Sequence, residues 1–378
     1  MTTLAVLAPT HYLSGDGALE EVGRVALALG GGRAGAGVLL VHGGVGLDLV
    51  RPGVEAALER AGLRRAAYAV DGPCRPELAA AAARAALGAS LLVGVGGGRV
   101  LDVTKAAAEA AGLACVLVPT SPATCAAATA VVVEYTPAGA YVRSRLTARP
   151  PAYALVDPAV LAAAPDRHLA AGLVDALAKV VEVRFGLART GGGGAGAVAA
   201  LALCDALETL VFDDGPGAVA AGRDTAKRRE VAEAAVLWPG LVGALAGEGA
   251  KLAAAHAVHN ALTLVPGTRS ALHGEILAFG ILVQLALEGR DDAEIERHAR
   301  LFARLGCPMT LAELGAGAYL TDPVVSAGVL ARALDLPSMR LSFPGIGERE
   351  LAEAFAAAQA VGTALAGSAG AGVSRRSG

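Results

Sequence analysis

The chain has 378 residues, which is more than one hydrophobic core normally organises, so two domains are expected. Its formal net charge is −3 with acidic and basic residues interspersed, which excludes a basic surface for nucleic acid or for an anionic membrane. The five cysteines form no CxxC pair, and the sequence has neither a leader-like start nor an unbroken apolar run of about 18 residues. We therefore expect a cytoplasmic protein without disulfides or membrane spans, whose partner is a small-molecule substrate.

From residue 37 to residue 121, short apolar runs alternate with turns and alanine-rich segments. The apolar runs read GVLLVHGG, RAAYAVDG, SLLVGVGGG and ACVLVPTS. The segments between them read VEAALERAGL, ELAAAAARAALG and VLDVTKAAAEAAG. Alternating strand and helix signals indicate a parallel sheet with helices on its faces. We therefore expect an α/β domain over residues 1–160.

After about residue 150, apolar residues recur at helical spacing and strand signals become scarce. The segments DRHLAAGLVDALAKVVEVRFG, GAVAALALCDALETLVF, AKRREVAEAAVLWPGLVGALAG and AAAHAVHNALTLV all show this spacing. Prolines cluster in RPPAYALVDPAVLAAAPDR, where we expect the junction, and YALVD within it predicts a last strand of the first domain. We expect a helical domain over residues 161–366 and a disordered tail over residues 367–378.

Three glycines, Gly96, Gly97 and Gly98, stand between an apolar run and the helical segment RVLDVTKAAAEAA. Glycine lets the backbone approach a bound group closely, and the free N–H groups and positive dipole at a helix start stabilise phosphate oxygens. The same glycines are compatible with a simple tight turn, because the G-x-G-x-x-G spacing is absent. Asp102 and Lys105 lie one helical turn apart, where they could orient the turn or its ligand, or form a solvent-exposed ion pair.

Histidines concentrate in the helical half. AAAHAVHNALT places His256, His259 and Asn260 on one helix face, and SALHGEILAFG places His273 at the start of the next helix. A single histidine on an alanine face is more often a core side chain, but Asp175 is a carboxylate on an apolar face, which is costly to bury without a partner. A divalent cation would provide that partner. One carboxylate and two imidazoles form a three-ligand site with an open position, as in catalytic zinc sites, and such a site also suits ferrous iron.

Five segments carry a resemblance to a known family. In chain order they are GVGGGRVLDVTK, VPTSPATCAAATAVVVEYT, AAGLVDALAK, AAAHAVHNALT and LHGEILAFG, and the match extends from about Val38 to Leu314. They resemble the glycerol dehydrogenase branch of the iron-containing alcohol dehydrogenase and dehydroquinate synthase-like superfamily. The resemblance implies a dinucleotide-binding α/β domain, an all-helical domain, a metal ion in the cleft between them, and a homo-oligomer.

The resemblance also implies roles for individual residues. The glycine turn is similar to a pyrophosphate cradle for NAD or NADP, and Asp102 and Lys105 complete that motif. The metal ion, with Zn²⁺ favoured and Fe²⁺ as the alternative, has the implied ligands Asp175, His256 and His273. The residues that resemble nicotinamide contacts are Thr120, Thr129, Val131, Val133 and Tyr135.

Two positions depart from the family pattern. Members that prefer NAD carry an acidic residue at the end of the first strand, where it binds the adenosine ribose, whereas this chain has His42 and Gly43. The choice between NAD and NADP therefore stays open. Glycerol dehydrogenases have an aspartate at the position of Cys125, where it helps to hold the polyol. The sequence ATCAA instead resembles a sister branch, the 2-hydroxycarboxylate dehydrogenases, so Cys125 is expected to line a pocket for a 2-hydroxy acid, with a small buried packing residue as the alternative.

We predict a metal-dependent, NAD(P)-linked oxidoreductase that interconverts a small polar alcohol, with a 2-hydroxy acid favoured, and its carbonyl compound. His259 and Lys179, each one turn from an expected ligand, could relay a proton or balance charge, and packing beside the ligands is the alternative. Three other functions are considered: a glycerol or polyol dehydrogenase, a dehydroquinate synthase-like cyclase, and a cofactor-binding protein without turnover. The cyclase is disfavoured because few lysines and arginines surround the histidines, and the binding protein is disfavoured by the complete ligand set.

Overall fold

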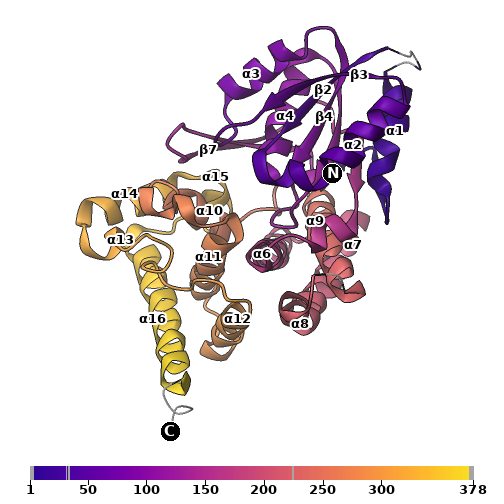
Figure 1. The fold of residues 1–378 in the computed structure, drawn as a ribbon. Coiled ribbons are helices and arrows are strands. Elements are labelled where there is room, and N and C mark those ends of the chain that lie inside the picture. Colours follow the sequence, from indigo (N-terminus) through magenta and orange to yellow (C-terminus); the bar gives the residue numbers. More distant parts are fainter. Residues whose placement is uncertain (1–3, 31, 33–34, 224, 374–378) are drawn as a thin grey trace.

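The first part of the chain forms a six-stranded parallel sheet in the computed structural model, which describes residues 4–30, 32, 35–223 and 225–373. The strand order is β1–β8–β5–β4–β2–β3, and every neighbouring pair is parallel. Figure 1 labels β2, β3 and β4 of this sheet. The strands are β1 (His11–Ser14), β2 (Gly37–His42), β3 (Arg64–Ala69), β4 (Ala89–Gly96), β5 (Ala114–Pro119) and β8 (Tyr153–Val156). The segment YALVD therefore supplies the last strand of this sheet, as the sequence predicts.

Helices cover both faces of the sheet. They are η1 (Ala18–Glu21), α1 (Val22–Leu29), α2 (Gly44–Arg60), α3 (Pro76–Ala85), α4 (Gly98–Ala111) and the short η2 (Ala126–Ala128). Adjacent residues of β2 point to opposite faces, so Leu39 packs in a cluster with α3 and α4, whereas Leu40 packs in a cluster with α1 and α2. Because both faces are buried, the strands read as nearly continuous apolar runs. The α/β class predicted for this part is confirmed.

The carboxyl ends of β2 and β4 form the topological switch point of the sheet. Strand β2 lies between β3 and β4, so the connections that leave these strands run to opposite sides. Ligands of open parallel sheets bind outside the carboxyl ends of the strands at such a point. Strand β2 ends at His42 and strand β4 ends at Gly96. The glycine turn therefore lies at the same edge of the sheet as His42 and Gly43, the residues that differ from the family pattern for binding the adenosine ribose.

The remainder of the chain is helical, and no strand follows Val156 within the described residues. Its long helix α6 packs against α7, α9 and α11 (Figure 1). The expected domain junction at residues 160/161 falls inside α5, which packs against α9. The helices are α5 (Pro158–Ala162), α6 (Asp166–Thr190), α7 (Ala195–Thr209), the π-helical η3 (Leu210–Asp214), α8 (Gly215–Ala220), α9 (Ala226–Ala246), α10 (Ala254–Leu262), η4 (Pro266–Ser270), α11 (His273–Leu287), α12 (Asp292–Arg304), α13 (Ala318–Thr321), α14 (Pro323–Asp335), α15 (Pro337–Ser342) and α16 (Glu348–Val373).

A separate two-stranded hairpin, which lies between β5 and β8 in the sequence, contacts the helical part of the chain. Its antiparallel strands are β6 (Val131–Tyr135) and β7 (Tyr141–Leu146), and β7 extends toward α14 and α15 (Figure 1). The backbone N–H of Tyr141 donates to Oγ1 of Thr263 at 2.8 Å, and Nη2 of Arg332 donates to the carbonyl of Val142 at 3.3 Å. The hairpin is thus held against the end of α10 and against α14.

Two glycines allow the sheet part and two helices to approach closely. A Cβ at Gly172 of α6 would lie 1.9 Å from the carbonyl oxygen of Pro122, in the loop after β5. A Cβ at Gly274 of α11 would lie 1.8 Å from the carbonyl oxygen of Ala171 in α6. No side chain fits at either contact, so glycine lets backbone pack on backbone. These contacts bring the loop after β5 and the start of α11 to α6, within one turn of Asp175.

The end of the chain differs from the expected tail. Helix α16 continues through Val373, so residues 367–373 are helical, and residues 374–378 lie outside the described residues. Alanine is the strongest helix former, and its recurrence in AFAAAQAVGTALAGSAGA favours extending the helix despite the glycines.

One helical stretch, Ala195–Ala220, is long and apolar enough to cross a membrane by length and composition alone. It comprises α7, η3 and α8. Two of its acidic side chains, Asp205 and Glu208, form ion pairs with Arg184 of α6, and its Cys204 and Leu207 are buried. The stretch therefore packs as part of the helical bundle in this structure.

Candidate active site

The glycine turn leaves open space at the start of α4. A Cβ at Gly96 would lie 2.8 Å from Cγ2 of Val100, and a Cβ at Gly98 would lie 2.8 Å from Oγ1 of Thr124, so packing requires glycine at both positions. A Cβ at Gly97 would meet nothing in the described protein closer than Cβ of Ser121, at 3.9 Å. Gly97 is also the N-cap of α4, so no side chain caps the first N–H groups of the helix. This open helix start fits the pyrophosphate of a dinucleotide.

Asp102 and Lys105 form a buried ion pair, so the solvent-exposed pair considered from the sequence is wrong. Nζ of Lys105 lies 2.9 Å from Oδ1 of Asp102, and both side chains are buried. The same ammonium donates to the carbonyl oxygens of Ala126, at 3.0 Å, and Val131. Oδ2 of Asp102 accepts from the backbone N–H of Val133 at 3.1 Å. The pair therefore holds the segment from η2 to β6 against α4, behind the glycine turn.

The residues expected at the nicotinamide lie on that segment and on the loop before it. The backbone N–H of Thr120 donates to the carbonyl oxygen of Gly96 at 3.1 Å, which joins the end of β5 to the glycine turn. Thr129 lies directly before β6. Along β6 the side chains of Val132 and Glu134 are buried, and the alternate residues are half-buried on the other face. The half-buried residues are Val131, Val133 and Tyr135. Their contact with a nicotinamide stays a prediction.

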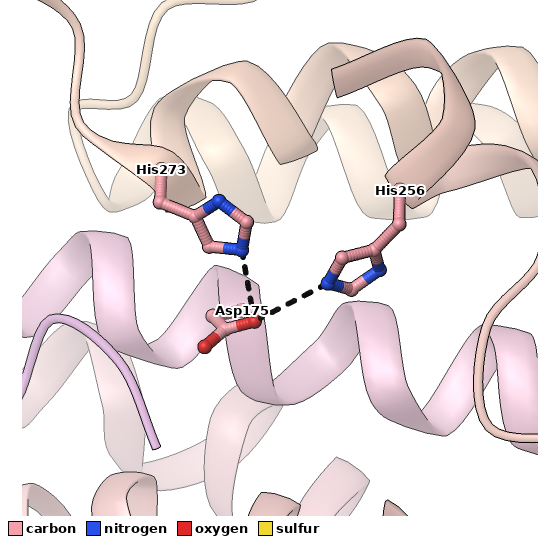
Figure 2. A group of neighbouring side chains, drawn as sticks. All are labelled: Asp175, His256 and His273. Atoms are coloured by element: carbon pink, nitrogen blue, oxygen red, sulfur yellow. Dashed lines mark ion pairs between the residues drawn. The ribbon is translucent and has the colours of Figure 1, made fainter. Parts of the chain in front are cut away.

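Asp175, His256 and His273 converge from three helices. They come from α6, α10 and the first residue of α11, and Figure 2 shows both imidazoles pointing at the carboxylate. Oδ1 of Asp175 lies 3.8 Å from Nε2 of His256 and 3.5 Å from Nε2 of His273. One ligand atom from each residue lies within 4.8 Å of the others. The start of α11 at His273 is confirmed.

The three residues fit a divalent cation. Oδ1 of Asp175 is buried and has no hydrogen-bond partner within the described residues, which is costly for a carboxylate oxygen. One carboxylate and two imidazoles are the donor set that Zn²⁺ and Fe²⁺ accept with an open coordination position. Burial opposes ionisation of Asp175, but His273, Lys179 and His256 outweigh it and hold the pKa of Asp175 below its ordinary value. Burial lowers the pKa of His256. Both groups are therefore in the forms that bind a metal ion at neutral pH.

Glu182 orients His256, a role that the sequence analysis missed. Nδ1 of His256 donates to Oε2 of Glu182 at 2.6 Å, so Nε2 faces Asp175 with its lone pair. Oε1 of Glu182 accepts the backbone N–H of His256 at 2.9 Å and that of Ala253 at 2.8 Å. A carboxylate that accepts the second N–H of a metal-binding histidine is a recurrent feature of metal sites. The available signal was spacing, because Glu182 follows Asp175 by seven residues and so lies on the same helix face.

His259 acts through His273 rather than facing the cluster itself. Nδ1 of His259 lies 2.9 Å from Oδ1 of Asn260, an acceptor, so Nδ1 carries the proton. Nε2 of His259 then accepts from Nδ1 of His273 at 2.8 Å. In the neutral ring this tautomer places the lone pair of His273 on Nε2, which faces Asp175. Burial holds the pKa of His259 well below its ordinary value, which keeps it neutral.

Lys179 and Cys125 complete the surroundings of the cluster. Lys179 is buried, and its Nζ lies 3.1 Å from Nε2 of His256. Cys125 is half-buried in the loop before η2. Burial, and secondarily the charge of Asp175, raises the pKa of the Cys125 thiol to about 12. The thiol is therefore neutral at physiological pH.

The parallel sheet is covered on both faces and carries an open glycine turn, and the helical part carries a buried carboxylate and two imidazoles. This combination defines the class of metal-dependent, nucleotide-linked dehydrogenases. A family model described as iron-containing alcohol dehydrogenase matches residues 9–158. Glycolaldehyde reductase of Halobacterium salinarum is 33% identical over 332 residues, which cover 86% of this chain and 88% of that protein. Hydroxycarboxylate dehydrogenase A of Escherichia coli K12 is 35% identical over 242 residues, which cover 60% of this chain and 63% of that protein. The solved structure of a probable glycerol dehydrogenase from Sinorhizobium meliloti 1021 matches with a TM-score of 0.82 and 29% identity, and covers 96% of this chain and 100% of that chain.

The chain belongs to the iron-containing alcohol dehydrogenase family. It is accordingly a metal-dependent, NAD(P)-linked oxidoreductase that acts on the CH–OH group of small polar substrates. The family and the fold predicted from the five sequence segments are confirmed.

Proposed function

We propose that the protein reduces small 2-oxo acids to 2-hydroxy acids, and catalyses the reverse oxidation, with one divalent cation held by Asp175, His256 and His273. The observation that carries the choice of substrate is the neutral thiol of Cys125 near Asp175. An aspartate at this position would repel a substrate carboxylate and would accept hydrogen bonds from a polyol, and the thiol does neither. The named relatives include a glycolaldehyde reductase, a hydroxycarboxylate dehydrogenase and a probable glycerol dehydrogenase, so residues of this chain must decide among these classes.

The proposed chemistry divides between bound groups and the chain. A divalent cation supplies Lewis acidity toward the substrate oxygen, and a nicotinamide donates or accepts the hydride. We favour Zn²⁺ and keep Fe²⁺ as the alternative for this donor set. Glu182 and His259 orient the two imidazoles, so that each presents an unprotonated Nε2. The glycine turn binds the pyrophosphate, and the Asp102–Lys105 pair sets the distance between this turn and β6.

The burial of the cluster supports catalysis in another way. The side chains of Asp175, Lys179, Glu182, His256 and His259 are all buried. A site from which water is excluded strengthens electrostatic interactions with a substrate oxygen.

The experiment that tests this function is a substrate comparison with the purified protein. Small 2-oxo acids, glycolaldehyde and glycerol are assayed with NADH or NADPH, or with the oxidised cofactors, in the presence of Zn²⁺ or Fe²⁺. We expect the highest kcat/KM for a 2-oxo acid. A higher kcat/KM for glycerol oxidation would assign the protein to the polyol dehydrogenases instead.

A further inference from the structure

Lys179 is a buried ammonium group beside the expected metal ligands. It follows Asp175 by four residues on α6, so both side chains leave the helix on the same face. Its Nζ lies 3.1 Å from Nε2 of His256, the atom that faces the cluster. Within the described residues, no carboxylate oxygen lies within 4.0 Å of this ammonium. Its charge lowers the pKa of Asp175 without a direct ion-pair contact. A buried ammonium that lacks such a contact is costly, so a further role for its charge is expected.

The nearby carboxylates are already engaged. Asp175 faces the two imidazoles, and Glu182 accepts three hydrogen bonds from His256 and Ala253. When a divalent cation is bound, its two charges balance these two carboxylates, and the charge of Lys179 is left uncompensated. Cys125, in the loop before η2, adds no negative charge to the site, because its thiol is neutral. The loaded site therefore carries one excess positive charge, which an anionic substrate would neutralise.

The position of this charge matches one class of substrate. In a 2-oxo or 2-hydroxy acid, the carboxylate is bonded directly to the reacting carbon, so the two functional groups are neighbours. Nζ of Lys179 likewise lies 3.1 Å from Nε2 of His256, the atom expected to bind the metal ion, so the ammonium lies beside the expected metal position. A charged ammonium and a carboxylate form a strong hydrogen bond when both are desolvated. A neutral aldehyde or a polyol offers no such partner.

We propose that Lys179 binds the substrate carboxylate and thereby selects 2-oxo and 2-hydroxy acids over neutral alcohols and aldehydes. This inference rests on the proposed function, since it assumes that the acid is turned over at this site. It goes beyond that function by naming the residue that recognises the acid. Lys179 is then a binding residue for the substrate, in place of the proton relay or packing role considered from the sequence.

The test uses Lys179→Met, which keeps the length of the side chain and removes its charge, with Lys179→Arg as the variant that restores a cation. Lys227→Met is the matched control, because Lys227 is a half-exposed lysine on α9 that pairs with Asp214 and Glu230. Metal content and circular dichroism are measured first for each variant. The kinetic readout is the ratio of kcat/KM for a 2-oxo acid to kcat/KM for glycolaldehyde. The equilibrium readout is the affinity of oxamate, an unreactive 2-oxo acid analogue, for the enzyme–NADPH complex, followed by NADPH fluorescence.

We expect Lys179→Met to lower the acid-to-aldehyde ratio by about 30-fold or more, mainly through KM, because a charged hydrogen bond to the substrate is lost. The oxamate affinity falls in parallel, Lys179→Arg restores part of both losses, and Lys227→Met leaves both unchanged. Equal loss on both substrates, or an unchanged oxamate affinity in a Lys179→Met protein that is folded and metal-loaded, would overturn the role of Lys179. If the wild-type protein neither turns over 2-oxo acids nor binds oxamate, the proposed function fails first and this inference fails with it.

Discussion

Glu182 accepts the Nδ1 proton of His256 at 2.6 Å and thereby determines which ring nitrogen faces Asp175. The same carboxylate accepts the backbone N–H of His256, so the side chain and the backbone of the ligand are held by one group. Burial opposes ionisation of Glu182, but the neighbouring His256 outweighs it and holds the pKa of Glu182 below its ordinary value. The carboxylate is therefore charged whenever the site is in use.

This relationship predicts that Glu182→Gln weakens metal binding without removing a ligand. The amide keeps the shape of the side chain but is uncharged, so it makes the His256 imidazole a poorer ligand. We expect metal affinity to fall by about 10–100-fold, as is usual when such an orienting partner is removed. A competition titration with a chelator measures it. The exposed Glu230→Gln is the control, and an affinity equal to the wild type in Glu182→Gln would show that Glu182 is a packing residue only.

The glycine turn predicts a loss of cofactor binding in Gly97→Val. Gly97 has φ −81° and ψ −179°, an extended conformation that valine adopts readily, and its Cβ would lie in open space. The variant should therefore fold with an unchanged Tm, and its side chain should occupy the space of the pyrophosphate. We expect nicotinamide affinity to fall by at least about tenfold, or 1.4 kcal/mol, by fluorescence titration. Gly97→Ala should show a smaller loss of nicotinamide affinity. Wild-type affinity in both variants would show that the pyrophosphate does not bind at this glycine turn.

The lack of an acidic residue at the end of β2 predicts that the protein uses NADPH at least as well as NADH. His42 and Gly43 lie at the switch point of the sheet, and neither carries the negative charge that repels a 2′-phosphate. An acidic side chain is not readily accommodated at Gly43, since a Cβ there would lie 2.9 Å from Cγ2 of Val100. The dissociation constants of both reduced cofactors test this expectation, and His42→Asp should shift them toward NADH. A wild-type preference for NADH above about a hundredfold, or 2.7 kcal/mol, would mean that another residue makes the discrimination.

The neutral thiol of Cys125 predicts a shift in substrate preference when a charge is introduced. Cys125→Asp places a carboxylate near Asp175 and Lys179, where it repels an anionic substrate and can bind a polyol. We expect the ratio of kcat/KM for 2-oxo acid reduction to that for glycerol oxidation to fall by about 10–100-fold. Cys125→Ser, which is small and neutral, should leave the ratio near the wild-type value. An unmoved ratio in Cys125→Asp would make Cys125 a packing residue.

Much of the fold was predictable because it depends on local patterns. Alternation of apolar runs with alanine-rich segments predicted the parallel sheet, and helical spacing predicted the second half of the chain. Asp175, His256 and His273 were named from sequence motifs, and the structure brings their ligand atoms within 4.8 Å.

The rest depends on tertiary contacts that periodicity does not encode. Glu182 of α6 pairs with His256 of α10, which is 74 residues away in the sequence, so only the packing of the two helices reveals this contact. The burial of the Asp102–Lys105 pair likewise depends on η2 and β6, which fold over α4. An i,i+3 spacing of opposite charges is the same in a buried pair as in an exposed one, so the sequence alone could not distinguish them.

The metal content of the active protein tests the central claim most directly. The purified protein is stripped with a chelator, assayed with its best substrate, and assayed again after titration with Zn²⁺ or Fe²⁺, beside His273→Ala treated in the same way. We predict that turnover disappears in the stripped protein, returns as about one ion per chain is bound, and does not return in His273→Ala, which stays folded. Full turnover by the stripped wild-type protein would contradict the account.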